Sequence, residues 1–377
     1  MRIAIISSVR SLNYGGCLQA YALGKIIKEY GKGDVTFEYL DYQRNYYKDS
    51  LAWLTRKILY GILHKDDTPS CTIREFVQTA FARKKNDYSN ATDNFRKFWE
   101  LTPCTAPLWR KDVVKLEDMY DLFIIGSDQN WNCGRLNLDK TLLLDFVKNR
   151  EKKGSYAPSI GMKVIPEKYE KAYIANWKEF NYLSCRELSG AQLINSMIGC
   201  DVKWVLDPSL LLNKEQWEII ADKSMLDGQE YVLVYMLEES EKLLQFAKEL
   251  AEQKKKKLKF IYGDISKNHS IGPQQWLGLF MGASYVVTNS FHGMAFSINF
   301  HKDFYVEIKK KSLCLDSSDR ITGLLQAFNL QNRLLENENV PKIFSQIDYS
   351  YVDERLSKMR RESINYLCEM LNKSRSF

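Results

Sequence analysis

A histidine and an arginine each follow a short apolar run that predicts a buried strand. His292 comes shortly after the run 285–288, and Arg186 directly follows the run 182–185. An imidazole can donate and accept a proton near neutral pH, which suits it to general acid and base catalysis. A guanidinium at the end of a strand can bind a carboxylate or a phosphate through paired N–H groups. Together the two residues predict chemistry on an anionic substrate.

Both residues also have a structural alternative. His292 stands at the start of the helix expected over residues 294–299, so it could cap that helix or fill a face between two domains. Arg186 could pair with the neighbouring Glu187 or with Asp207. The residue types alone leave these alternatives open.

Further polar residues occupy loops after predicted strands. Asp128 and Gln129 follow the apolar run 122–125, and Ser290 precedes the histidine. Short polar groups at such positions can hold sugar hydroxyls, and a serine hydroxyl can donate to a phosphate. The same residues are also common helix caps and turn formers. The loop Asn13-Tyr14-Gly15-Gly16 between the first strand and the first helix is by itself a weak signal.

The elements that must position these loops alternate between strands and helices. Strands are predicted over residues 2–7, 35–40 and 122–125, with a helix over 18–30. Residues 231–236, 241–255, 258–261 and 285–288 repeat the strand and helix order. We therefore expect an α/β fold of two Rossmann-like domains, 1–207 and 208–377, facing a cleft. The last helix, over 351–371, is expected to pack back on the first domain.

Composition narrows the class of protein. The chain has 377 residues, of which 45% are hydrophobic and 27% charged, as in soluble globular proteins. No apolar run is long enough for a transmembrane helix, and the apolar start is too short for a signal peptide. The eight cysteines are scattered, which favours reduced thiols and a cytoplasmic location. Dinucleotide, P-loop and metalloprotease motifs are absent, and no spacing predicts a metal site.

The segment 44–118 is basic and rich in aromatic residues. Between Arg44 and Lys115 it carries fourteen basic and eight acidic residues. Such a segment can contact nucleic acid, a membrane surface, or an anionic or sugar ligand. The alternative is a solvated helical insert with its own apolar face. Residues 51–63 could lie on a membrane surface or form a buried helix of that insert.

Six loop motifs, taken together, are more specific than any one residue. They span residues 13–23, 124–132, 155–161, 184–190, 205–211 and 287–298. In this order they resemble the polysaccharide pyruvyl transferase family, over residues 1–43 and 119–330. The chain departs from the family pattern at Asn289, where an aspartate is common, and near Gln274 and Gln275, where an acidic residue is common.

The resemblance implies a fold like that of GT-B glycosyltransferases. It also implies transfer of pyruvate from phosphoenolpyruvate onto two hydroxyls of a sugar, as a cyclic ketal. The co-substrate is then phosphoenolpyruvate, with no other cofactor and no metal. The residues implied as catalytic are His292 and Arg186. Those expected to bind the donor are Arg186, Ser290, Phe291, His292, Gly293 and Arg320; those expected to bind the acceptor are Asn13, Tyr14, Gly15, Asp128, Gln129 and Trp131.

Two other functions remain open. A glycosyltransferase on the same fold would use a nucleotide sugar in the second domain. A non-catalytic protein that binds sugar or nucleic acid would act through the basic segment and leave the six loops without a role, so it ranks last. For the first hypothesis we expect an acceptor in a surface polysaccharide or its lipid-linked precursor, at the inner face of the membrane. No nucleic-acid partner is expected, and the acceptor sugar, the ketal stereochemistry and the oligomeric state are left open.

Overall fold

A computed structural model describes residues 1–31, 33, 35–44, 90–133, 138–308, 318–335 and 345–373. Within this part of the chain, the first parallel sheet has the strand order β3-β2-β1-β4-β5. Its strands are β1 (Arg2–Ile6), β2 (Thr36–Tyr42), β3 (Cys104–Leu108), β4 (Leu122–Ile125) and β5 (Lys153–Ser155). This is the order of a Rossmann-like half. A short pair, β6 (Ser184–Cys185) and β7 (Lys203–Trp204), continues beside β5 through a bridge between Gly154 and Tyr182.

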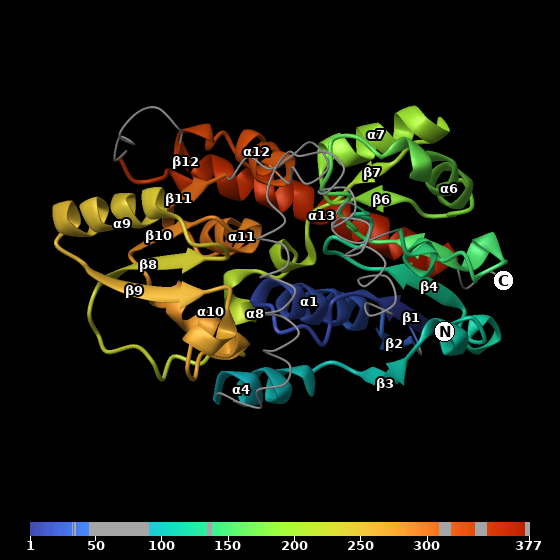
Figure 1. Cartoon of the computed structure of the whole chain (residues 1–377), viewed down its shortest axis with the longest axis horizontal. Helices are drawn as coiled ribbons and strands as arrows, with labels where there is room; N and C mark the ends of the chain where they lie inside the picture. The colour runs from blue at the N-terminus through green and yellow to red at the C-terminus, as the bar shows by residue number, and fades with distance from the viewer. Residues whose placement is uncertain are drawn as a thin grey trace, which may run out of the picture.

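The second parallel sheet has the strand order β12-β11-β10-β8-β9. Its strands are β8 (Tyr231–Met236), β9 (Lys257–Tyr262), β10 (Tyr285–Thr288), β11 (Asp303–Glu307) and β12 (Leu334–Leu335). Every residue of β8 is buried, because helices cover both faces of the sheet. The two sheets lie at opposite ends of the longest axis (Figure 1). The prediction of an α/β fold with two parallel sheets is confirmed, while the domain boundary after Asp207 stays a prediction.

Helices connect and cover these strands. The longer ones are α1 (Tyr14–Tyr30), α4 (Asn90–Trp99), α6 (Glu167–Trp177), α7 (Leu188–Ile198), α9 (Glu241–Lys254), α10 (Pro273–Gly282), α11 (Phe291–Asn299), α12 (Ser318–Ala327) and α13 (Tyr349–Lys373). Shorter ones are α5 (Arg110–Val113), α8 (Lys214–Glu218) and the 3-10 turns η1 (Glu117–Met119), η2 (Lys140–Leu143), η3 (Arg150–Lys152), η4 (Pro208–Leu210), η5 (Ile265–Lys267) and η6 (Gln331–Arg333). None of the described helices is long and apolar enough to cross a membrane.

The last helix, α13, contacts residues from both halves of the chain (Figure 1). At its start, the Tyr349 hydroxyl donates to the Lys302 carbonyl over 2.7 Å. Farther along, the Tyr366 hydroxyl donates to the Ser155 carbonyl over 2.9 Å, and the Leu206 N–H donates to Ser363 Oγ over 3.0 Å. The helix therefore connects the two halves of the chain.

Two helices begin earlier than the periodicity predicts. Asn13 caps α1 by accepting from the Gly16 N–H over 2.9 Å, so the helix begins at Tyr14 instead of residue 18. Ser290 caps α11 by accepting from the Gly293 N–H over 3.2 Å, so that helix begins at Phe291 instead of residue 294. Side-chain caps satisfy the free N–H groups of a first turn and thereby fix where a helix starts. The site histidine therefore lies within the first turn of α11.

The predicted insert 44–118 needs a correction. Part of it, β3, is the edge strand of the first sheet and pairs with β2 in parallel. Residues 45–89, including the predicted membrane-surface segment 51–63, lie outside the described residues. The edge strand is only partly buried, so its sequence lacks the apolar run that marks a central strand.

Candidate functional site

A pocket of about 330 Å³ lies between the two sheets, and both sheets contribute to it. In each sheet the strand order reverses at one point, between β1 and β4 in the first and between β8 and β10 in the second. Loops that follow strands at such points diverge and leave a crevice where ligands bind. The lining residues are Asn13, Asp128, Gln129, Leu237, Glu238, Gly263, Asn289, Ser290, Phe291, His292, Glu307, Ile308, Ser318, Arg320 and Ile321.

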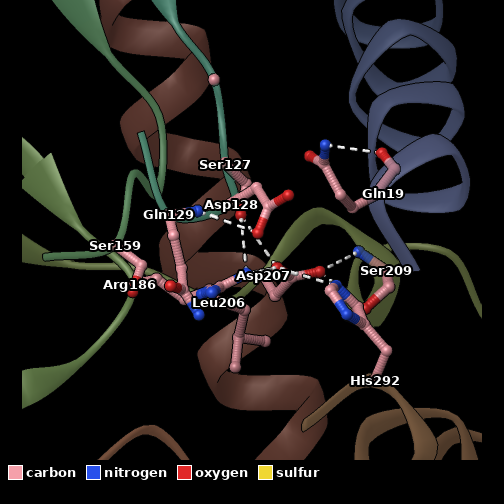
Figure 2. Close-up of polar contacts among 12 residues, drawn as sticks. Gln19, Ser127, Asp128, Gln129, Ser159, Arg186, Leu206, Asp207, Ser209 and His292 are labelled. Atoms are coloured by element: carbon pink, nitrogen blue, oxygen red, sulfur yellow. Dashed lines mark hydrogen bonds and ion pairs between the residues drawn. The ribbon is translucent and has the colours of Figure 1, made fainter. Parts of the chain in front are cut away.

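A buried carboxylate, Asp207, lies at the base of the site between Arg186 and His292 (Figure 2). Its Oδ2 accepts from Arg186 Nη1 and from Ser127 Oγ, each over 2.8 Å. Its Oδ1 accepts from the Ser209 N–H over 2.9 Å and from the Ser209 hydroxyl over 2.7 Å. Burial alone would raise the pKa of Asp207, but the neighbouring imidazole and guanidinium hold that pKa well below its usual range. The side chain is therefore an anion at neutral pH.

The structure places His292 within reach of that anion. Its Nε2 lies 3.7 Å from Asp207 Oδ2, at ion-pair distance but beyond a normal hydrogen bond. On the other side, a Cβ built on Gly15 would stand 2.0 Å from the imidazole Nδ1. Only a glycine leaves room for the ring at this position of α1. His292 therefore lies at one edge of the pocket, where three parts of the chain meet. These are the loop at Gly15, the segment that contains Asp207, and the start of α11.

Arg186 belongs to the base of the site and not to its open surface. Its side chain is 1% exposed and pairs with Asp207, as the structural alternative predicted. Burial alone would lower the pKa of Arg186, but the carboxylates of Asp207 and Asp128 raise it. The space beside its guanidinium is a cavity of about 10 Å³, room for roughly one water. In the structure Arg186 neutralises and positions Asp207, and direct binding of the donor by Arg186 stays a prediction.

Arg320 provides a guanidinium that lines the pocket itself. With the amide oxygen of Gln129 turned toward it, Gln129 accepts from Arg320 Nη2 over 2.7 Å and from Nη1 over 3.1 Å. The guanidinium carbons of Arg320 and Arg186 lie 5.8 and 4.7 Å from the centre of the Phe291 ring. Cations near an aromatic face are held by the ring's quadrupole. Phe291 therefore helps to position both arginines.

Asp128 lines the pocket from the loop after β4 in a left-handed backbone conformation, with φ of 83°. Its Oδ1 accepts from the Gln129 N–H over 2.8 Å. Burial would raise the pKa of Asp128, but the charges of Arg186 and His292 lower it. This carboxylate is therefore a hydrogen-bond acceptor on the first-domain side of the pocket.

Two neighbouring residues shape the second-domain side. Ser290 serves as the cap of α11, the structural alternative, while lining the pocket. Asn289 donates to the Glu238 carbonyl over 2.7 Å and accepts from the Leu237 N–H over 2.8 Å. An ionised aspartate could make only the second of these bonds, so the asparagine suits this loop. Gly293 faces inward, where a Cβ would stand 2.4 Å from Thr288 Oγ1.

Two aromatic residues expected at the acceptor side lie in the core instead. Tyr14 is 1% exposed, stacks on Trp276 and donates its hydroxyl to the Ile271 carbonyl over 2.8 Å. Trp131 is also 1% exposed and donates its indole N–H to the Leu142 carbonyl over 2.9 Å. Neither presents a face to the pocket, so neither can serve as a platform for a sugar ring. Gly15 acts through the space it leaves for His292.

Sequence reasoning left two residues out of the candidate site. Asp207 was considered only as a partner of Arg186, although it lies inside one of the six motifs, 205–211. Glu307 at the end of β11 lines the pocket and was not considered. Its position directly after the apolar run Phe304–Val306 is the signal that could have found it. Within the described ranges, no three His, Cys, Asp or Glu side chains gather closely enough to hold a metal ion.

The fold is an α/β arrangement of two parallel sheets with a pocket between them. The sequence model described as polysaccharide pyruvyl transferase matches residues 13–306, most of the chain. The chain belongs to the polysaccharide pyruvyl transferase family. The resemblance found in the six loop motifs is thereby confirmed, and no curated protein matches the chain in sequence.

Solved structures similar to this chain include enzymes of sugar nucleotides. UDP-GlcNAc 2-epimerase from Neisseria meningitidis bound to UDP-GlcNAc is 11% identical, with a TM-score of 0.47 and coverage of 99% of this chain and 100% of that chain. The UDP-GlcNAc 2-epimerase of Methanocaldococcus jannaschii is 10% identical, with a TM-score of 0.45 and coverage of 97% and 93%. ADP-heptose LPS heptosyltransferase II from E. coli is 10% identical, with a TM-score of 0.36 and coverage of 96% and 99%.

Proposed function

We propose that this protein transfers pyruvate from phosphoenolpyruvate onto two hydroxyls of a sugar, forming a cyclic ketal and releasing phosphate. The observation that carries the proposal is the arrangement of His292 between the Asp207 carboxylate and a pocket that also contains Arg320. A cation and an imidazole at one pocket edge suit a donor that carries both a carboxylate and a phosphate. Family membership supports pyruvyl transfer to a polysaccharide.

The reaction balances without a further reactant. A proton added to the methylene carbon of phosphoenolpyruvate makes the central carbon electrophilic, and the first sugar hydroxyl adds there. The bond to the phosphate oxygen breaks with its electron pair, and the second hydroxyl closes the ketal. The sugar loses two hydroxyl protons. One restores the proton that the acid gave to the methyl group, and the other is carried away by the released phosphate.

Each residue has a role in this scheme. His292 holds the proton that is delivered, and the anion of Asp207 stabilises the imidazolium 3.7 Å away. Arg320 binds the anionic donor, and Gln129 orients its guanidinium. Arg186 is a positioning residue, because its ion pair fixes Asp207. Asp128 and Asn13, which line the pocket from the first domain, contact the sugar hydroxyls.

The test combines binding and turnover. Phosphoenolpyruvate should raise the melting temperature of the wild type by mass action. Arg320→Gln should abolish that rise, and His292→Ala should keep the rise but lose phosphate release in the presence of a panel of methyl glycosides. Arg361→Gln, an exposed arginine of α13, is the matched control. No response to phosphoenolpyruvate together with a rise for a nucleotide sugar would replace the proposal with glycosyl transfer.

A further inference from the structure

Glu307 is a buried carboxylate whose two oxygens differ in their contacts. It ends β11, lines the pocket and is 6% exposed. Its Oε1 accepts from Ser240 Oγ over 2.9 Å. Its Oε2 is buried and has no hydrogen-bond partner within the part of the chain that the structure describes. A buried carboxylate oxygen without a partner is costly, so such an atom points to a ligand that satisfies it.

The Glu307 carboxylate lies at the N-terminus of α9. Ser240 is the cap of α9, a helix of fourteen residues, so the carboxylate bonds to the residue that begins this helix. The partial positive charge of a helix N-terminus stabilises an anion placed there. The serine hydroxyl also fixes the orientation of the carboxylate. Glu307 is therefore held as a fixed hydrogen-bond acceptor at the pocket wall.

Basic and acidic side chains line different parts of the second-domain wall of the pocket. Arg320 and His292 lie on the side of α12 and α11, whereas Glu307 and Glu238 come from the ends of β11 and β8. Phosphoenolpyruvate is an anion, so its favourable place is the arginine side and a carboxylate repels it. A sugar hydroxyl is neutral and supplies the O–H that an unpartnered carboxylate oxygen accepts.

We propose that Glu307 binds a hydroxyl of the acceptor sugar through Oε2, so that the reacting sugar lies over the carboxyl ends of β8 and β11. The inference rests on the proposed function, which places the anionic donor beside Arg320. It adds a contact from the second domain to those that Asp128 and Asn13 make from the first. The acceptor is then recognised from both domains, with Asp128 on the opposite wall.

The test compares Glu307→Gln with Glu241→Gln, which removes a charge from the exposed first turn of α9 outside the pocket. Calorimetric titration with phosphoenolpyruvate should give dissociation constants within about threefold of wild type for both variants, because the donor lies away from Glu307. Binding that tightens by about tenfold or more in Glu307→Gln would place the donor against this carboxylate and overturn the inference. This measurement needs no acceptor.

Turnover supplies the second readout. Phosphate release with phosphoenolpyruvate and the methyl glycoside panel should fall about 10- to 100-fold in kcat/KM for the acceptor in Glu307→Gln, the worth of a hydrogen bond to a charged group. Ser240→Ala, which keeps the charge but frees the carboxylate, should show a smaller loss. Its melting temperature should be lower because the cap of α9 is gone, but phosphoenolpyruvate should raise it by as much as in wild type. Wild-type turnover in Glu307→Gln would overturn the inference while leaving the proposed function intact. Failure of wild-type protein to bind phosphoenolpyruvate would instead overturn the proposed function.

Discussion

The imidazole of His292 lies directly against the backbone of Gly15, so that a Cβ on this glycine would stand 2.0 Å from Nδ1 and 2.2 Å from Cγ. These residues are far apart in the chain and begin two different helices, α1 and α11. The contact joins the glycine loop of the first domain to the histidine loop of the second. The position of the imidazole therefore depends on how the two halves of the chain meet.

Gly15→Ala should displace the His292 ring. Because real Cβ contacts are never this short, the ring must leave its place beside Asp207. We expect phosphate release to be lost, with a destabilisation of about 1–3 kcal/mol from overpacking. Gly323→Ala, where a Cβ meets nothing within 4 Å, is the control and should retain activity. Full activity of Gly15→Ala would show that the imidazole is not needed in its observed place.

Asp207→Asn should destabilise the protein strongly near neutral pH. The change leaves the Arg186 guanidinium buried with its charge uncompensated, which costs about 3–5 kcal/mol. Urea unfolding at pH 7 measures the loss, with Asp353→Asn, an exposed pair with His301, as the control. A change no larger than that of Asp353→Asn would contradict the assigned role.

The stability difference between wild type and Asp207→Asn should depend on pH with a definite sign. Because the pKa of Asp207 is lowered in the folded state, its contribution is complete above the unfolded value, about 3.9, and is lost as pH falls below it. The two proteins should therefore converge in stability at strongly acidic pH. A difference that stays constant from pH 6 to pH 3 would contradict the lowered pKa.

Tyr14→Phe should affect stability and leave ligand binding unchanged. The hydroxyl donates to the Ile271 carbonyl and accepts from Asn268 Nδ2 over 3.0 Å, both across the interface between the halves. Losing these bonds should cost about 1–3 kcal/mol, because their buried partners are left unsatisfied. Thermal unfolding with and without phosphoenolpyruvate measures both effects. Weaker ligand binding at unchanged stability would restore Tyr14 as a ligand-binding residue.

Lys302 should make stability rise with pH in the alkaline range. Burial, with a smaller effect from Lys214, lowers the pKa of Lys302 to about 8. The unfolded chain then holds more protons than the folded one between about pH 8 and 10, so unfolding becomes less favourable as pH rises. Lys302→Met should remove this rise, whereas Lys248→Met, on the exposed face of α9, should keep it. Equal pH profiles for wild type and Lys302→Met would contradict the assignment.

The central strands could be predicted from sequence, whereas the roles of individual site residues often could not. β8 and β10 match their predicted bounds because continuous apolar runs mark strands buried on both faces. β3 was missed because an edge strand needs no such run. Three of the six loops, 13–23, 124–132 and 287–298, contribute residues to the pocket.

Which side chains turn toward the pocket depends on packing that the sequence does not display. Tyr14 and Trp131 stand in loop motifs beside polar residues, yet both fill the core. Arg186 has two acidic neighbours in the sequence argument, and only the fold shows that Asp207 is the one it pairs with. Glu307 was overlooked because it lies in no motif.

The position of the long helix α13 in the chain also affects the order in which the parts of the protein complete their packing. Leu367 and Met370 are fully buried in the core that includes Ile3 and Leu122 of the first sheet. Met370 packs beside Gly154 so closely that a Cβ there would stand 2.3 Å from its Sδ. During synthesis from the N-terminus, the first sheet therefore remains without this cover until α13 has left the ribosome. The first sheet, although translated before the second, completes its packing only after the strands of the second have been made.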